Sequence, residues 1–315
     1  TEPWLGGKKP TSLSFSLNSS RQTNGLSKRL KQSDLDNSSF LAQNYEVGDL
    51  NPNLQELKVQ GASLFIGKRL QRPDDFFMLY TGISFQHFQL NNYRAFFGNF
   101  SNGNANNLAY NFTLTRSSTS EPIYPTYGSQ ITFTSKLTPP YKILQERFGG
   151  KSFDYENMTE QERFQTVEYF KLKFTGSWFL PITSDKKLVL MPRIGFGFMG
   201  AYSNTKGLTP FERFALGGNG LSGMNQLGGR EMIALRGYND NSLSSSASDP
   251  IITKYTLELR YPISLNPQAT FYVLAFGEAG NTYTNIKKYN PFNVKRSAGV
   301  GVRVFLPMFG MLGLD

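Results

Sequence analysis

The chain has 315 residues, with 33 basic and 23 acidic side chains and a formal net charge of +10. It contains no cysteine and one histidine, which excludes a disulfide scaffold, a thiolate metal site and a cysteine nucleophile. One imidazole cannot supply the usual ligands of a zinc site, so we expect neither a metal nor a cofactor. Aromatic residues make up 14% of the chain and 30 residues are glycine, which favours extended β structure over disorder.

Alternation of apolar and polar residues is the dominant pattern, and it is typical of strands with one apolar and one polar face. No run of apolar residues is long enough for a transmembrane helix. The predicted strands in chain order are 11–19, 61–70, 76–86, 110–115, 130–137, 170–178, 188–198, 254–261, 270–280 and 299–306.

The apolar faces fit two architectures. In a soluble sandwich they would point into a shared core, and in a membrane barrel they would point outward to lipid. The polar faces carry Lys, Arg, Glu, Gln, Ser and Gly, which suits a wet barrel lumen. A soluble sandwich could expose such a face too, so alternation alone leaves both architectures open.

The connections between the predicted strands favour the barrel. Short polar turns at 72–75 and 183–186 contrast with long polar stretches, as in outer-membrane barrels, whereas long structureless loops are uncommon in soluble domains. We therefore predict an all-β fold, a transmembrane antiparallel β-barrel with roughly eleven strands in this chain. A short surface helix is expected within 154–168. The predicted long loops are 20–59, 91–106, 138–166, 202–250 and 281–295.

Two possible enzyme or nucleotide motifs lack the context they need. Residues 218–223 match the G-x-G-x-x-G pattern, but no helix start follows, which argues against a dinucleotide site. His87 could serve an outer-membrane hydrolase, but no partner serine is marked, so a barrel-surface role is favoured. The basic residues are dispersed rather than clustered, which argues against a nucleic-acid partner.

The strongest signal is Arg236-Gly237-Tyr238, late in the longest predicted loop. Glu258 and Glu278 lie on the predicted inward faces of the two strands that follow. An arginine at the tip of a loop folded into the barrel could pair with both, because its planar guanidinium offers bidentate hydrogen bonds. The alternative is an ordinary exposed turn arginine.

These residues belong to a set of segments in which the chain resembles the BamA family, the barrel-bearing assembly factors of Gram-negative outer membranes, and looks closest to the Bacteroidetes-type form. The loop-tip motif is shared across a superfamily that also includes two-partner-secretion translocators and TamA-like proteins. The opening segment favours BamA within it. The matching segments are Thr-Glu-Pro-Trp-Leu-Gly-Gly at 1–7, Phe-Ala-Leu-Gly-Gly at 214–218, Leu-Arg-Gly-Tyr at 235–238 and Ser-Ala-Gly-Val-Gly-Val-Arg at 297–303.

The resemblance implies a sixteen-stranded barrel preceded by POTRA domains, with a lateral gate between its first and last strands. Residues 1–315 would then be a partial C-terminal barrel domain with a re-entrant loop at about 201–250. The POTRA domains, the first strands and the last strand are expected to be absent. Residues 219–234 look like an insertion into the loop.

The resemblance also implies a function without enzymatic chemistry: folding and inserting other outer-membrane β-barrels through the gate by strand augmentation, without ATP. The expected location is the Gram-negative outer membrane, and the expected partners are unfolded outer-membrane clients, accessory assembly subunits, lipid and lipopolysaccharide. Arg236, Gly237 and Tyr238 would form a latch, with Glu258 and Glu278 as its lumenal partners and Gly217 and Gly218 as the loop glycines. A translocator of the same superfamily and a passive porin remain alternatives.

Overall fold

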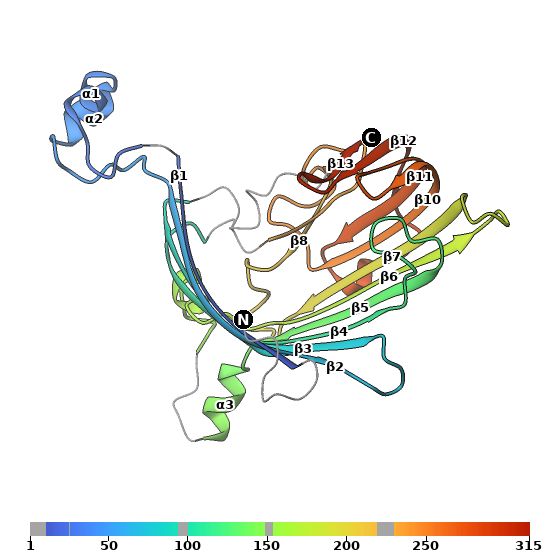
Figure 1. The fold of residues 1–315 in the computed structure, drawn as a ribbon. Helices are drawn as coiled ribbons and strands as arrows, with labels where there is room; N and C mark the ends of the chain where they lie inside the picture. The colour runs from blue at the N-terminus through green and yellow to red at the C-terminus, as the bar shows by residue number, and fades with distance from the viewer. Residues whose placement is uncertain (1–10, 25, 94–99, 149–153, 219–229) are drawn as a thin grey trace.

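The protein, described by a computed structural model for residues 11–24, 26–93, 100–148, 154–218 and 230–315, is built on one curved antiparallel sheet (Figure 1). The sheet has eleven strands, and neighbours in the sheet are consecutive along the chain except where β7 pairs with β10. The predicted all-β barrel fold is confirmed. The strands of the sheet are β1 Thr11–Thr23, β2 Glu56–Arg69, β3 Phe77–Asn91, β4 Gly103–Ser117, β5 Gly128–Leu137, β6 Phe170–Pro181, β7 Val189–Gly200, β10 Ile251–Asn266, β11 Ala269–Tyr283, β12 Lys295–Leu306 and β13 Gly310–Leu314.

The two faces of the sheet differ as the alternation predicts. Ile83 and Leu257 point outward and are 55% and 51% exposed, whereas Glu258 and Glu278 point inward and are 6% and 5% exposed. No second sheet covers the outward apolar face among the described strands. The sandwich architecture is therefore excluded for this part of the chain.

The inward face is less wet than expected. Near the short turns, Phe179, Val189 and Met191 join an inward apolar cluster with Tyr124 and Phe276. A larger cluster lies toward the long connections, where loop residues pack on the inward side of the sheet. The wet lumen that the polar faces suggested does not extend through these two regions, because buried apolar side chains from the loops and the sheet pack against each other there.

Strands and helices extend into several of the predicted loops. Strand β3 continues to Asn91 and β4 begins at Gly103, because their backbones keep pairing beyond the region of clear alternation. The helix expected within 154–168 is confined to α4, Glu160–Arg163, where Thr159 and Glu162 form a capping box. The other helical segments, which the sequence pattern did not predict, are α1 Gln32–Asp36, α2 Ser39–Asn44, α3 Tyr141–Arg147 and η3 Ile286–Lys288.

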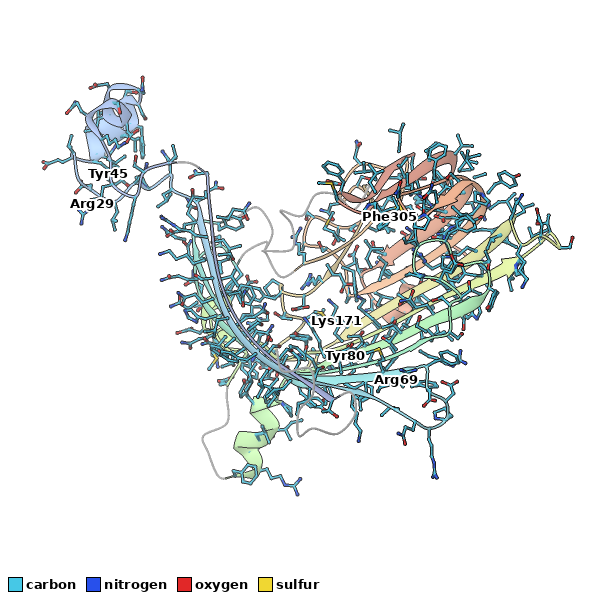
Figure 2. The ribbon with its side chains drawn as sticks, viewed as in Figure 1. Arg29, Tyr45, Arg69, Tyr80, Lys171 and Phe305 are labelled. Atoms are coloured by element: carbon cyan, nitrogen blue, oxygen red, sulfur yellow. The ribbon has the colours of Figure 1, made fainter. Side chains whose placement is uncertain are left out.

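Helices α1 and α2 belong to a segment that projects from the end of the β1–β2 pair, and Arg29 and Tyr45 lie on it away from the sheet (Figure 2). None of the helices in the described ranges has the length and apolar character needed to cross a membrane.

Replacing an outward apolar residue with arginine should destabilise the protein in lipid. We expect Ile83→Arg to lower the free energy of unfolding in phospholipid vesicles by about 2–4 kcal/mol, the cost of a cation on the lipid face near the bilayer midplane. Thr175→Arg is the matched control, because Thr175 is exposed on the inward face. Denaturant titration in vesicles measures both, and equal losses would contradict the assignment of the two faces.

Candidate functional site

Residues 201–250 connect β7 to β10, and the described parts of this loop, 201–218 and 230–250, fold back against the inward face of the sheet. Within them, β8 (Phe214–Leu216) and β9 (Glu231–Ile233) form a parallel two-stranded sheet. The Phe214 backbone also exchanges two hydrogen bonds with Asp249, at 2.8 and 2.9 Å. β8 is therefore tied to the C-terminal end of the loop, next to the start of β10, and it is fully buried.

Gly217 and Gly218 fix the turn that carries the loop tip. Gly217 N donates to the Ile233 carbonyl at 3.1 Å, and Gly218 N donates to the Tyr238 carbonyl at 2.9 Å. Their φ angles are +128° and +80°, which disfavour any residue with a Cβ. A Cβ on Gly217 would lie 2.3 Å from the Asn239 carbonyl oxygen. These glycines are therefore required both by backbone conformation and by the close approach of the loop tip.

Arg236 reaches from this tip to the sheet and contacts both predicted carboxylates. Its Nη2 donates to Glu258 Oε1 at 2.7 Å and to Glu278 Oε1 at 2.9 Å. Its backbone N–H donates to Glu278 Oε2 at 2.9 Å, so Glu278 holds both the main chain and the side chain of the arginine. The Arg236 side chain is only 11% exposed, which excludes the alternative of an ordinary exposed turn arginine.

Each carboxylate has a second cationic partner on the sheet. Arg260 donates twice to Glu258 Oε2, at 2.9 and 2.6 Å, and Lys254 Nζ lies 2.9 Å from Glu278 Oε1. Lys254 also donates to the carbonyl oxygen of Ala234 at 2.5 Å, which attaches the strand to the loop just before the arginine. These pairs distribute the charge so that neither buried carboxylate depends on Arg236 alone.

An aromatic ring and the motif tyrosine complete the seat of the loop tip. The Arg236 guanidinium carbon lies 3.6 Å from the centre of the Phe276 ring, a cation–π contact. Gly237 has a φ of +82°, and Tyr238 donates its hydroxyl to the Arg296 carbonyl at 2.8 Å. The loop tip therefore contacts β10, β11 and β12 together.

A second ionic cluster holds the loop nearer its start. Lys136 and Lys171 lie 2.9 and 3.2 Å from the Glu212 carboxylate, and Lys171 also contacts Glu231 at 2.9 Å. Figure 2 labels Lys171, whose ammonium lies 4.5 Å from the centre of the Phe214 ring. Burial raises the pKa of Glu212, but the two lysines outweigh it and lower that pKa to about 2. Glu212 thus remains ionised although it is buried.

The residues of this second cluster and the auxiliary partners of Arg236 were not predicted. Lys254, Arg260 and Phe276 lie at inward positions of the strands, and alternation could have flagged the two cations. Glu212 carries no local signal except its place just before the Phe-Ala-Leu-Gly-Gly segment. Its partners come from β5 and β6, far away in sequence.

Among the described residues, the remaining motifs form no second site. His87 lies on the outward face, and its Nδ1 is 2.8 Å from the side-chain oxygen of Asn106, an amide rather than a serine. The G-x-G-x-x-G match extends over 219–223, outside the described residues. No group of three or more His, Cys, Asp or Glu side chains in the described ranges could hold a metal ion. The contacts around Arg236 hold a loop in place; they include no nucleophile paired with a base.

An antiparallel sheet with an apolar outer face, charges on its inner face and a loop fixed inside defines the class of outer-membrane-type β-barrels. Within that class the chain belongs to the Omp85 superfamily, whose domain matches residues 1–315.

Two solved structures give the fold comparison. BamA from Haemophilus ducreyi lacking POTRA domains 1–3 is similar to 99% of this chain with a TM-score of 0.64 and 16% identity. CdiB from Escherichia coli gives a TM-score of 0.44 and 12% identity over 80% of this chain and 39% of its own. The chain spans 56% of the BamA structure, and at this identity the likeness shows the fold alone. No curated protein sequence matches significantly.

Removing the arginine should destabilise the loop without collapsing the sheet. We expect Arg236→Ala to lower the free energy of unfolding by about 1–3 kcal/mol, because Glu258 and Glu278 each keep a second cation. Arg116→Ala is the control, since Arg116 pairs with Asp74 at a more exposed turn and should cost less than about 1 kcal/mol. Denaturant titration compares the two variants; an Arg236→Ala loss no larger than the control would argue against a structural role for the pair.

The loop glycines allow backbone strain and steric clash to be separated. Gly207 has a φ of +74°, and a Cβ added there would meet no atom within 4 Å, so Gly207→Ala should cost about 1–2 kcal/mol from conformation alone. Gly217→Ala adds the clash with the Asn239 carbonyl and should cost at least about 1 kcal/mol more. Thermal unfolding measures both, and equal shifts would show that the tip relaxes around a side chain.

Proposed function

We propose that this chain is part of the barrel domain of a BamA-type assembly factor, which folds and inserts other β-barrels into the outer membrane. The Omp85 superfamily match and the BamA-like fold support the class of function. In this proposal residues 1–315 form a partial C-terminal barrel domain, and the loop at about 201–250 is its re-entrant loop.

The observation that carries the proposal is the attachment of one loop tip to three adjacent strands. Arg236 contacts β10 and β11 through Glu258 and Glu278, and Tyr238 contacts β12. A tip held in this way fixes the position of strands near the end of the sheet, where the proposed gate would lie. We propose that Arg236, Gly237 and Tyr238 act as a latch that keeps this part of the barrel aligned while the gate offers its strand edge to a client.

The mechanism requires no covalent step. An unpaired strand edge would pair with an incoming strand, so that backbone N–H and C=O groups are satisfied before they meet hydrocarbon. The energy comes from hydrogen bonding and burial of the client, so ATP and a cofactor are not needed. The proposed partners are unfolded outer-membrane proteins, accessory assembly subunits, lipid and lipopolysaccharide, with no nucleic acid. The proposed location is the outer membrane of a Gram-negative bacterium.

An assembly assay with the full-length protein tests this function. Arg236→Ala should slow the insertion of a small client barrel into vesicles by roughly tenfold, if about 1.4 kcal/mol of latch energy holds the active arrangement. Arg116→Ala, at the rim that carries the short turns, should insert clients at the normal rate. The folded fraction of each variant is measured beside its rate, so a slow rate is scored only for folded protein. Unchanged insertion by folded Arg236→Ala protein would contradict the latch.

Client range separates the assembly factor from a translocator of the same superfamily. Depletion of an assembly factor should reduce many outer-membrane barrels together, because all of them use the same insertion route. Depletion of a translocator should stop secretion of one partner protein and leave barrel levels unchanged. Quantitative proteomics of the outer membrane after depletion gives the answer.

A further inference from the structure

A groove on the outward face of the sheet runs across β6, β7, β10, β11 and β12. Its volume is about 840 Å³. Its floor lies at Gly277, where a Cβ would meet no atom within 4 Å. The outward side chains that line it are Trp178, Pro192, Ile194, Tyr255, Leu257, Ala279, Arg296 and Ala298.

The groove is apolar because its side chains belong to the outward set of each strand. The inward neighbours of Leu257 and Gly277 are Glu258 and Glu278, whose side chains bind Arg236 on the other face. A single layer of sheet thus separates the groove from the loop tip. In a bilayer this surface would face the acyl chains.

A cationic segment borders the groove at the rim that carries the long connections. Residues 281–296 contain Lys287, Lys288, Lys295 and Arg296 and no acidic residue. Lys287 and Lys288 are exposed, and neither makes an ion pair within the part of the chain that the structure describes. The segment is anchored, because Tyr283 donates its hydroxyl to the Asn290 carbonyl at 2.5 Å.

The cationic segment lies against the same outward face as the groove. The Tyr289 ring is 5.8 Å from the ring of Phe196, and its hydroxyl is 3.4 Å from Thr253 Oγ1. Two groove-lining residues are next to these contacts on the outward face. Ile194 lies two positions from Phe196 on β7, and Tyr255 lies two positions from Thr253 on β10. Tyr289, which directly follows Lys287 and Lys288, is therefore held next to the end of the groove that faces the long connections, and Arg296 lines the groove itself.

We propose that this surface is a binding site for lipid A, a phosphorylated and acylated glycolipid. One acyl chain lies in the groove over Gly277, and a phosphate lies against Lys287, Lys288 and Arg296. An acyl chain fits the apolar lining, and a phosphate fits a cationic segment that contains no acidic residue. Lipid A is chosen over a phospholipid because the long-connection rim of outer-membrane barrels faces the outer leaflet. The inference rests on the proposed outer-membrane location and assigns a binding site on this chain to the lipid anchor of the proposed partner lipopolysaccharide.

Native mass spectrometry of the full-length protein with added diphosphoryl lipid A tests the groove. Gly277→Phe fills the floor of the groove and should weaken lipid A binding by roughly tenfold. Ala275→Phe is the matched control, because Ala275 is exposed on the same face of β11 but does not line the groove. Equal weakening by both variants, or by neither, would overturn the groove as the acyl-chain site.

The cationic end is tested by removing its charge without removing bulk. The double variant Lys287→Gln with Lys288→Gln should weaken diphosphoryl lipid A binding by roughly tenfold, whereas Lys28→Gln with Lys31→Gln, exposed lysines in another long connection, should leave it unchanged. Phosphatidylglycerol is titrated in parallel. Equal affinity and equal loss for phosphatidylglycerol would mean a general anionic-lipid surface and overturn the lipid A assignment, as would unchanged lipid A binding in the lysine variant.

Insertion assays in vesicles that lack lipid A separate this inference from the proposed function. The groove and lysine variants should insert clients normally there, and Arg236→Ala should not. Loss of lipid A binding with normal insertion supports the site. Normal lipid A binding by the Gly277→Phe and lysine variants overturns the site and leaves the assembly function standing.

Discussion

Hydrogen bonding between neighbouring strands is the constraint on which the rest of the structure depends. The nine inner strands of the main sheet are paired on both sides, so they can present an apolar outer face without leaving backbone polar groups unpaired in hydrocarbon. The same pairing sends alternate side chains inward. Charged residues such as Glu258 and Lys171 are therefore collected on the concave side, where they can be paired only by one another and by the loop that folds against them.

The loop pairs with these inward charges at two points. Near its start, Glu212 neutralises lysines from β5 and β6, and near its tip Arg236 neutralises glutamates from β10 and β11. The loop contributes a carboxylate at the first attachment and a guanidinium at the second. Exchanging the two would place like charges together, so the loop has one favoured orientation. Between them, the buried strand β8 adds apolar contact with the sheet. Buried ion pairs give modest net stability, but they discriminate strongly between alternative placements of the loop.

Much of this arrangement could be predicted from the sequence, because alternation reports which face a residue occupies. The neighbours Leu257 and Leu259 place Glu258 on the inward face, and the loop-tip motif suggests its partner. Alternation does not show which loop residues pack against the inward face of the sheet. The apolar clusters around Phe214 and Met191 depend on loops arriving from distant parts of the chain, and three-residue strands such as β8 are too short to show a period. The role of the Arg236 contacts as a latch remains a prediction.

The backbone pairing of Gly218 with Leu235, beside the β8–β9 contacts, has a consequence for how such loops can diverge. Arg236 comes one residue after this pairing, so the paired backbone sets the position of its guanidinium relative to Glu258 and Glu278. An insertion or deletion within 230–235 would shift the β9 pairing by whole residues and move the arginine out of register with both carboxylates. Changes of length are therefore disfavoured in the six residues that lead up to the arginine.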